Sequence, residues 1–188
     1  IYHGGEIAHR YIVGLYRDFE DIINKHHNVY FDGCASGGNR FDLGILSYFD
    51  QIWTSDDTDA YERINIQSGY SLAYPLRCLS NHVSDAPSHS VLRKTPIQTR
   101  FNVAFFGSLG FELDLKTLTK VEKNELKNEI EFYKNHRELV RDGDFYELKD
   151  IKKDGYALWL VVSKDKKEAV LGYFNSLQKM NPSIDEIK

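Results

Sequence analysis

The clearest candidate for chemistry is an acidic segment that follows a short apolar run, W-T-S-D-D-T-D at residues 53–59. Asp56, Asp57 and Asp59 place three carboxylates within four positions. Their mutual repulsion favours the neutral, protonated form of at least one of them, which suits a general acid. Trp53 is expected to supply apolar shielding or a stacking face for a sugar ring.

The same segment is also typical of a helix N-terminus. Residues from Ala60 to Leu72 have helical spacing, and Asp57 or Asp59 would hold the first turn by accepting backbone N–H bonds. Position relative to the helix start favours capping for Asp59 and leaves Asp56 as the carboxylate more suited to chemistry.

A second candidate is the loop C-A-S-G-G-N-R at residues 34–40, which contains Cys34, Gly37 and Gly38. Small residues let backbone N–H groups approach a ligand closely, and Cys34 would lie at a strand exit. Residue chemistry alone favours a plainer interpretation, in which the glycines serve turn geometry and Cys34 is a small buried apolar residue. Neither a G-x-G-x-x-G pattern nor a P-loop lysine is present, so a phosphate cradle is not supported.

Other side chains are weaker candidates. His82, in S-N-H-V-S, would follow a weakly predicted strand and line the site, although a structural, hydrogen-bonded histidine is the more frequent role. Cys78 and Met180 are interpreted as packing residues. The remaining aromatic cluster is predicted to belong to the core and comprises Phe101, Phe105, Phe106 and Phe111.

The elements that must position these loops alternate between helical and extended patterns. Helices are predicted at 6–26, 41–49, 60–72 and 99–107. A further long helix is predicted to begin at a Thr119–Glu122 capping box and to continue through Leu139, with a charged face toward solvent. Strands are predicted at 29–31, 51–54, 79–83 and 111–113. Such alternation predicts an α/β fold with a parallel sheet, in which functional side chains follow the carboxyl ends of the strands.

After Asp142 the pattern changes to antiparallel β-structure, with strands predicted at 145–148, 157–162 and 169–174 and a turn at 163–168. The first part contains about four βα units, whereas a complete (β/α)8 TIM barrel needs about 250 residues. The pattern therefore predicts a partial barrel with an open sheet edge.

Composition excludes several classes of function. A net charge of −4 and a pI near 6.0 argue against a nucleic-acid partner or an anionic membrane surface. No run is apolar enough to span a bilayer. The sequence has two cysteines and no C-x-x-C motif, which does not favour a disulfide framework. Its histidines show no H-E-x-x-H spacing, so no zinc site or other metal is expected.

Four blocks of sequence resemble glycoside hydrolase family 36, the microbial α-galactosidases. They are F-D-G-C-A-S-G-G-N-R-F-D-L-G at 31–44, Q-I-W-T-S-D-D-T-D-A at 51–60, N-H-V-S at 81–84 and T-R-F-N-V-A-F-F-G-S-L-G-F-E-L-D-L at 99–115. The first two blocks are long and specific, and the resemblance extends over nearly the whole chain.

The resemblance implies that residues 1–141 are the second half of a (β/α)8 catalytic barrel, with strands five to eight, and that residues 142–188 begin a C-terminal β-sandwich. It implies retaining hydrolysis of α-galactoside oligosaccharides of the melibiose and raffinose type, without a cofactor. Asp56 matches the family's general acid/base. Cys34 and the backbone of Gly37 match the segment that contacts the region of the galactose 2-hydroxyl. Family members also suggest a cytoplasmic location and a homo-oligomer for the full-length enzyme.

The family's nucleophile lies in a Lys-Trp-Asp motif at the end of the fourth strand, and this sequence contains no such motif. We therefore expect the 188-residue chain alone to be inactive. Two alternatives stay open: a transgalactosylase that uses the same Asp56, and a non-catalytic carbohydrate-binding or degenerate remnant.

Overall fold

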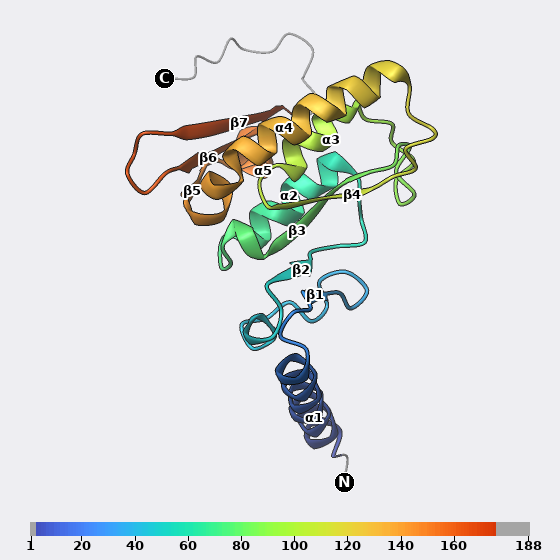
Figure 1. Cartoon of the computed structure of the whole chain (residues 1–188), viewed down its shortest axis with the longest axis vertical. Helices are drawn as coiled ribbons and strands as arrows, with labels where there is room; N and C mark the ends of the chain where they lie inside the picture. Colours follow the sequence, from blue (N-terminus) through green and yellow to red (C-terminus); the bar gives the residue numbers. More distant parts are fainter. Residues whose placement is uncertain (1–2, 176–188) are drawn as a thin grey trace.

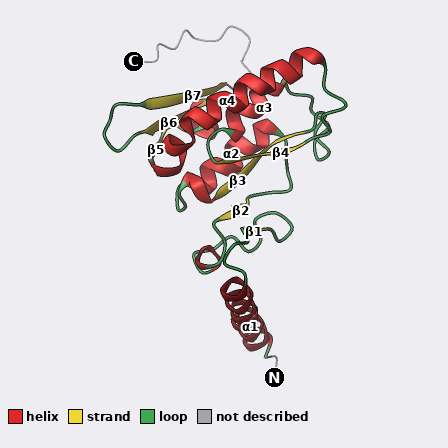
Figure 2. Ribbon diagram, in the orientation of Figure 1, coloured by secondary structure: helices red, strands yellow, loops and turns green. Residues whose placement is uncertain are grey.

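The computed structural model describes residues 3–175 (Figure 1). Helices and strands alternate along the first part of the chain, and three strands follow the longest helix (Figure 2). The helices are α1 (Gly4–Lys25), η1 (Ile45–Ser47), α2 (Ala60–Ser71), η2 (Leu76–Cys78), α3 (Ile97–Ala104), α4 (Lys120–Asp142) and α5 (Ile151–Asp154). The strands are β1 (Asp32–Gly33), β2 (Gln51–Trp53), β3 (Leu79–Ser84), β4 (Ser108–Glu112), β5 (Asp144–Lys149), β6 (Tyr156–Val162) and β7 (Ala169–Asn175).

The first four strands form a parallel sheet in the order β1-β2-β3-β4, as the alternating pattern predicts. The register pairs Ile52 with Leu79, and Ser80 with Ser108. Because the strands are parallel, their carboxyl ends all lie at one edge of the sheet. That edge carries the glycine loop (residues 34–40), the acidic loop (residues 54–59) and the segment that follows Ser84.

Helices α2, α3 and α4 lie on the same side of β3 and β4 (Figure 1). The strand β3 is buried almost throughout, with Leu79 and Val83 fully inaccessible to solvent. Burial on both faces is typical of a strand inside a parallel sheet. Ile64 of α2 and Phe101 of α3 belong to the core cluster that includes these residues.

Two helix starts agree with the sequence. Asp59 is the N-cap of α2, and its carboxylate accepts hydrogen bonds from the backbone N–H groups of Tyr61 and Glu62 at 3.0 and 3.1 Å. Thr119 and Glu122 form the predicted capping box of α4. The backbone and hydroxyl hydrogen bonds from Thr119 hold the pKa of Glu122 below its usual value.

The second sheet is antiparallel in the order β5-β6-β7, as predicted. Phe106, two residues after the end of α3, packs against Trp159 of β6 and Phe174 of β7, and its ring centroid lies 5.4 and 6.0 Å from theirs. Because all three aromatic side chains are buried, the two sheets share one core.

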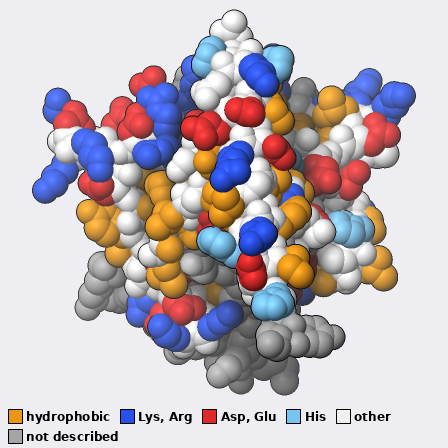
Figure 3. Space-filling view, turned by 90° about the horizontal axis from the view of Figure 1, so that it is seen from below, with side chains coloured by type: hydrophobic (Ala, Val, Ile, Leu, Met, Phe, Trp, Pro, Cys, Tyr) orange, Lys and Arg blue, Asp and Glu red, His pale blue; other side chains and the backbone are white. Residues whose placement is uncertain are grey.

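Helix α1 extends away from the other helices (Figure 1), and none of its residues is buried. Its contacts with the rest are made near its second half, where Phe19 packs edge-on against Phe49 at 4.8 Å. Seen from this end, acidic and basic side chains are intermixed (Figure 3). None of the helices within residues 3–175 is long and apolar enough to cross a membrane.

Several predicted elements differ from the structure. Residues 29–31 form no strand, and β1 is the short pair Asp32–Gly33, because within residues 3–175 this edge strand pairs with β2 alone. The predicted helix at 41–49 is reduced to the single turn η1. Phe111 is 41% exposed, so its assignment to the core was wrong, since it lies near the exposed end of β4. Met180 lies outside the described residues.

Candidate active site

Asp56 lies in the acidic loop directly after β2, at the carboxyl edge of the parallel sheet. Its side chain is exposed, and its Oδ1 accepts a hydrogen bond of 3.1 Å from Nε1 of Trp53. Trp53 itself is only 9% exposed. The indole N–H therefore restricts the orientation of a carboxylate that is exposed to solvent.

Two side chains hold the indole of Trp53. The guanidinium carbon of Arg63 lies 4.5 Å from the ring centroid, and the imidazole of His82 lies 4.2 Å from it at an interplanar angle of 34°. Cation–π attraction and stacking both restrict the ring. Trp53 thus acts in the structure as a fixed hydrogen-bond donor to Asp56.

Arg63, in the first turns of α2, is buried and ties the acidic loop to the sheet. It donates to the carbonyl oxygens of Ser55 at 2.9 Å and Ser80 at 3.1 Å, and to Oδ1 of Asn81 at 3.3 Å. Burial lowers the pKa of Arg63 to about 10, so the side chain remains a cation at neutral pH. Asn81 in turn donates to the carbonyl of Phe106 at 2.9 Å, which links the loop to the core.

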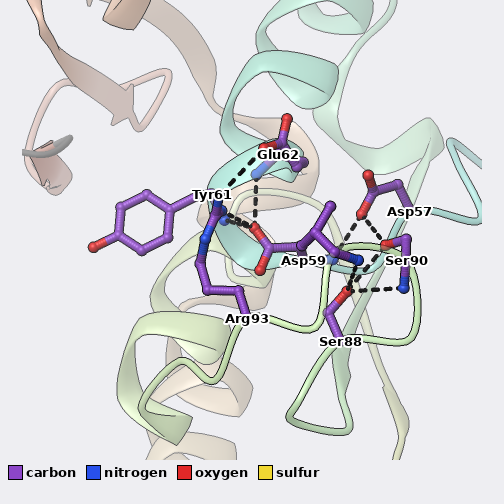
Figure 4. Close-up of polar contacts among 8 residues, drawn as sticks. Asp57, Asp59, Tyr61, Glu62, Ser88, Ser90 and Arg93 are labelled. Carbon is purple, nitrogen blue, oxygen red and sulfur yellow. Dashed lines mark hydrogen bonds and ion pairs between the residues drawn. The ribbon is translucent and has the colours of Figure 1, made fainter.

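The other two aspartates of the loop have structural partners (Figure 4). Asp57 accepts hydrogen bonds from the hydroxyl of Ser90 at 2.7 Å and from the backbone N–H of Asp59 at 3.1 Å. Asp59 caps α2 and forms an ion pair with Arg93. The structure confirms capping for Asp59 and distinguishes Asp56 as the exposed carboxylate of the three.

The glycine loop packs directly against the acidic loop. Gly37 has φ +72°, and a Cβ placed there would lie 2.9 Å from both the backbone N of Asp56 and the Cα of Ser55. Such distances are shorter than van der Waals contact, so only glycine fits. Two blocks that are about twenty residues apart in sequence are thereby brought into one site.

Cys34 is exposed, which makes its interpretation as a buried apolar residue wrong. It follows the two-residue strand β1, and that edge position leaves its thiol uncovered. Cys34 lines a cavity of about 180 Å³ together with Asp32 and Arg40. Cys78, by contrast, is buried as predicted.

His82 lies within β3 and not after it, because the strand continues to Ser84. Burial lowers the pKa of His82, although Glu112 lies 3.8 Å away and opposes that effect. Its Nε2 lies 3.4 Å from the hydroxyl of Ser80, which donates to Asp32 at 3.3 Å. The imidazole packed on Trp53 thus helps to hold the hydrogen-bond donor of Asp56 in place.

Sequence reasoning missed Arg63, Ser90 and Arg93 as residues of the site. An arginine at a core-facing position of the predicted helix 60–72 was the available signal for Arg63. Nothing in the local sequence marks Ser90 or Arg93, because their partners lie 33 and 34 residues away. Within the described residues, no group of three or more histidine, cysteine or acidic side chains is arranged to hold a metal ion.

Comparison with known proteins shows to which family the chain is similar. The family described as Melibiase matches residues 2–143. Alpha-galactosidase AgaA of Geobacillus stearothermophilus is 43% identical over 183 residues, which are 97% of this chain and 25% of that protein. Alpha-galactosidase 1 of Pediococcus pentosaceus is 41% identical over 184 residues, 98% of this chain and 25% of that protein.

Solved structures show the same fold. A crystal structure of the GH36 α-galactosidase AgaA in complex with 1-deoxygalactonojirimycin superposes with a TM-score of 0.92 at 44% identity, and covers 95% of this chain and 25% of that one. Structures of AgaA variants with raffinose and with stachyose each give a TM-score of 0.91, at 43% and 44% identity, and cover 94% of this chain and 24% of theirs. This chain spans about a quarter of the length of the relatives it matches, and it belongs to the melibiase family, whose matched members are GH36 α-galactosidases.

Proposed function

We propose that this chain is part of a retaining α-galactosidase and that Asp56 is its general acid/base. The observation that carries the assignment is the difference in contacts and exposure among the three loop aspartates. Asp59 caps a helix and pairs with an arginine, and Asp57 binds a serine hydroxyl, whereas Asp56 is exposed beside a fixed indole N–H. Of these three aspartates, Asp56 is the exposed one.

In the proposed reaction, Asp56 first protonates the glycosidic oxygen while a second carboxylate attacks the galactosyl carbon. That second carboxylate belongs to a part of the enzyme outside this sequence. Asp56 then removes a proton from the water that hydrolyses the galactosyl-enzyme. Because Oδ1 of Asp56 accepts the bond from Trp53, we assign the proton transfers to Oδ2.

On the galactose side, we propose that Cys34 and the backbone of Gly37 contact the sugar. Support comes from the position of Cys34 directly after β1 and from the contact of Gly37 with the backbone at Asp56, which puts the glycine loop beside the proposed acid/base. Trp53 would exclude water from one side of the reacting oxygen and contributes its N–H.

Substrates of the raffinose type are proposed because AgaA variants have been crystallised with raffinose and stachyose. We further propose that the four βα units, residues 1–141, are half of a (β/α)8 barrel, and that residues 142–188 begin a β-sandwich. Assembly of the complete enzyme as a homo-oligomer in the cytoplasm stays a prediction from the family.

The test is Asp56→Asn in the full-length enzyme, with the exposed Asp50→Asn as the matched control. Loss of the acid should reduce kcat/KM on melibiose by about 100-fold or more and affect an activated aryl galactoside far less. Azide should restore turnover of the aryl substrate and release α-galactosyl azide, because it replaces the water that Asp56 activates.

Near-normal hydrolysis of melibiose by Asp56→Asn would overturn the assignment. The isolated 188-residue chain should show no hydrolysis of an aryl α-galactoside, because only one carboxylate of the retaining pair is assigned within it. Analysis of products with an added acceptor sugar separates hydrolysis from galactosyl transfer.

A further inference from the structure

The loop that connects β3 to α3, residues 85–96, contacts the acidic loop at two points (Figure 4). One point is Asp57 and the other is Asp59, so the contacts lie one and three residues after Asp56. No backbone pairing between strands accounts for them, since both are made by side chains. The two loops are therefore joined by the contacts of Ser90 with Asp57 and of Arg93 with Asp59, which we call the latch. Its residues come from distant parts of the sequence.

The first point is a chain of serine hydroxyls. Ser90 donates to Oδ1 of Asp57 at 2.7 Å, and its hydroxyl lies 3.0 Å from that of Ser88. Ser88 is buried and also accepts a bond from the backbone N–H of Ser90 at 3.3 Å. The buried Ser88 fixes Ser90, and Ser90 in turn fixes the side chain that follows Asp56.

The second point is an ion pair on a desolvated carboxylate. The side chain of Asp59 is fully inaccessible, and one guanidinium nitrogen of Arg93 contacts its Oδ1. The other terminal nitrogen lies 3.6 Å from Glu62, and the guanidinium carbon lies 5.2 Å from the ring centroid of Tyr61. A buried carboxylate is stabilised by such a cation, and the contacts with Glu62 and Tyr61 restrict the guanidinium although the side chain is 41% exposed.

These contacts restrict the position of Asp56. Arg63 binds the carbonyl of the preceding Ser55, and the latch binds Asp57 and Asp59 on the other side. The backbone at Asp56 is thus held from both directions, and Trp53 limits the orientation of its carboxylate. Misplacing a catalytic group by about 1 Å costs roughly 100-fold in rate, so this restraint has kinetic consequences.

We propose that Arg93 and Ser90 are positioning residues for proton transfer by Asp56, acting through Asp59 and Asp57. The proposal rests on the proposed function of Asp56. A latch that served stability alone would have the same hydrogen bonds, so the two roles must be separated by kinetics and not by denaturation.

The experiment compares Arg93→Gln, Arg93→Lys and Ser90→Ala with the control Lys94→Gln in the full-length enzyme. Lys94 is the exposed neighbour of Arg93 in the same loop. Each variant is assayed for kcat/KM on melibiose, whose leaving group needs protonation, and on an activated aryl galactoside, whose leaving group does not.

Arg93→Gln should lose roughly 10- to 100-fold on melibiose while staying within about threefold of the parent on the aryl substrate. Ser90→Ala should show the same selectivity at roughly three- to tenfold, and Arg93→Lys should fall between Arg93→Gln and the parent because it keeps the charge without the planar fork. Lys94→Gln should leave both values unchanged.

Equal losses on both substrates, in proportion to a lowered melting temperature, would show that the latch is only structural. If Arg93→Gln does not fold, Ser90→Ala decides, because it leaves the helix cap and the ion pair intact. A failure of Asp56→Asn itself to discriminate between the two substrates would instead refute the proposed function and is a separate result.

Discussion

The glycine loop and the acidic loop meet at the same edge of the sheet but are held by opposite means. The acidic loop is fixed by side chains, among them Arg63 on a carbonyl and Arg93 on a carboxylate. Among the described residues, the glycine loop has only longer side-chain bonds, such as that of Arg40 at 3.4 Å, and depends on the absence of a side chain at Gly37, where two backbones are too close for a Cβ.

The difference affects how each loop tolerates change. A contact between backbones accepts no substitution at the glycine, because relief requires movement of the main chain. A loop held by several side-chain bonds loses them one at a time, and each loss has a limited cost. We therefore expect a single substitution at Gly37 to disrupt the glycine loop. Removal of one side-chain bond should disturb the acidic loop only partly.

The largest effect is expected for Gly37→Ala. A left-handed alanine costs about 1–2 kcal/mol, and its methyl group would push the backbone at Asp56 out of place. We expect kcat/KM of the full-length enzyme on melibiose to fall by about 100-fold or more, with a smaller loss on an activated aryl galactoside. Steady-state kinetics on melibiose and an aryl substrate check this.

Gly69→Ala is the matched control, since nothing lies within 4 Å of a Cβ at this position in α2. It should raise the free energy of unfolding by about 0.5–1 kcal/mol and leave activity unchanged. Full activity of Gly37→Ala would contradict the close approach of the two loops.

Smaller effects, on stability, are expected from removing an arginine that binds a loop carbonyl. Arg63 binds one in the acidic loop, and Arg40 binds one in the glycine loop. Arg63→Met leaves the carbonyls of Ser55 and Ser80 without this donor inside the protein, so the free energy of unfolding should fall by about 3 kcal/mol. Arg40→Met removes only a longer bond of 3.4 Å to the carbonyl of Cys34 and should cost less than about 0.5 kcal/mol.

Urea denaturation of both variants measures the difference. Equal costs would mean that the acidic loop does not depend on its buried arginine, and the contrast between the loops would then rest on Gly37 alone.

The smallest effect is expected outside both loops, at Glu129 of α4. Burial, with a further contribution from Glu125, raises the pKa of Glu129 to about 7, from 4.5. Because the folded-state pKa is the higher one, the stability that the neutral carboxyl contributes is present below about pH 4.5 and is lost as the pH rises through 7.

Glu129→Gln should therefore gain stability relative to the parent between pH 5 and pH 8. Melting temperatures at the two pH values test this, with the exposed Glu131→Gln on the same helix as control. A constant difference across that range would contradict the raised pKa of Glu129.

Much of the fold follows from local patterns. Helical spacing located α1 and α2, and the capping box located the start of α4. The period-two segments located β5, β6 and β7. The predictions failed for residues 29–31 and 41–49, where the chain lies at the open edge and tertiary contacts with β2 decide what little regular structure forms.

The sequence by itself determined the order of βα units, the two loops at the strand ends and the likeness to one enzyme family, because periodicity, turn residues and motifs are local properties. Only the tertiary structure decided which aspartate is exposed, since the partners of Asp57 and Asp59 come from a loop more than thirty residues away. It alone also decided that Cys34 is exposed and that Gly37 lies against Asp56. Each of these depends on which strand ends are neighbours, and neighbours in a sheet are chosen by packing of the whole chain.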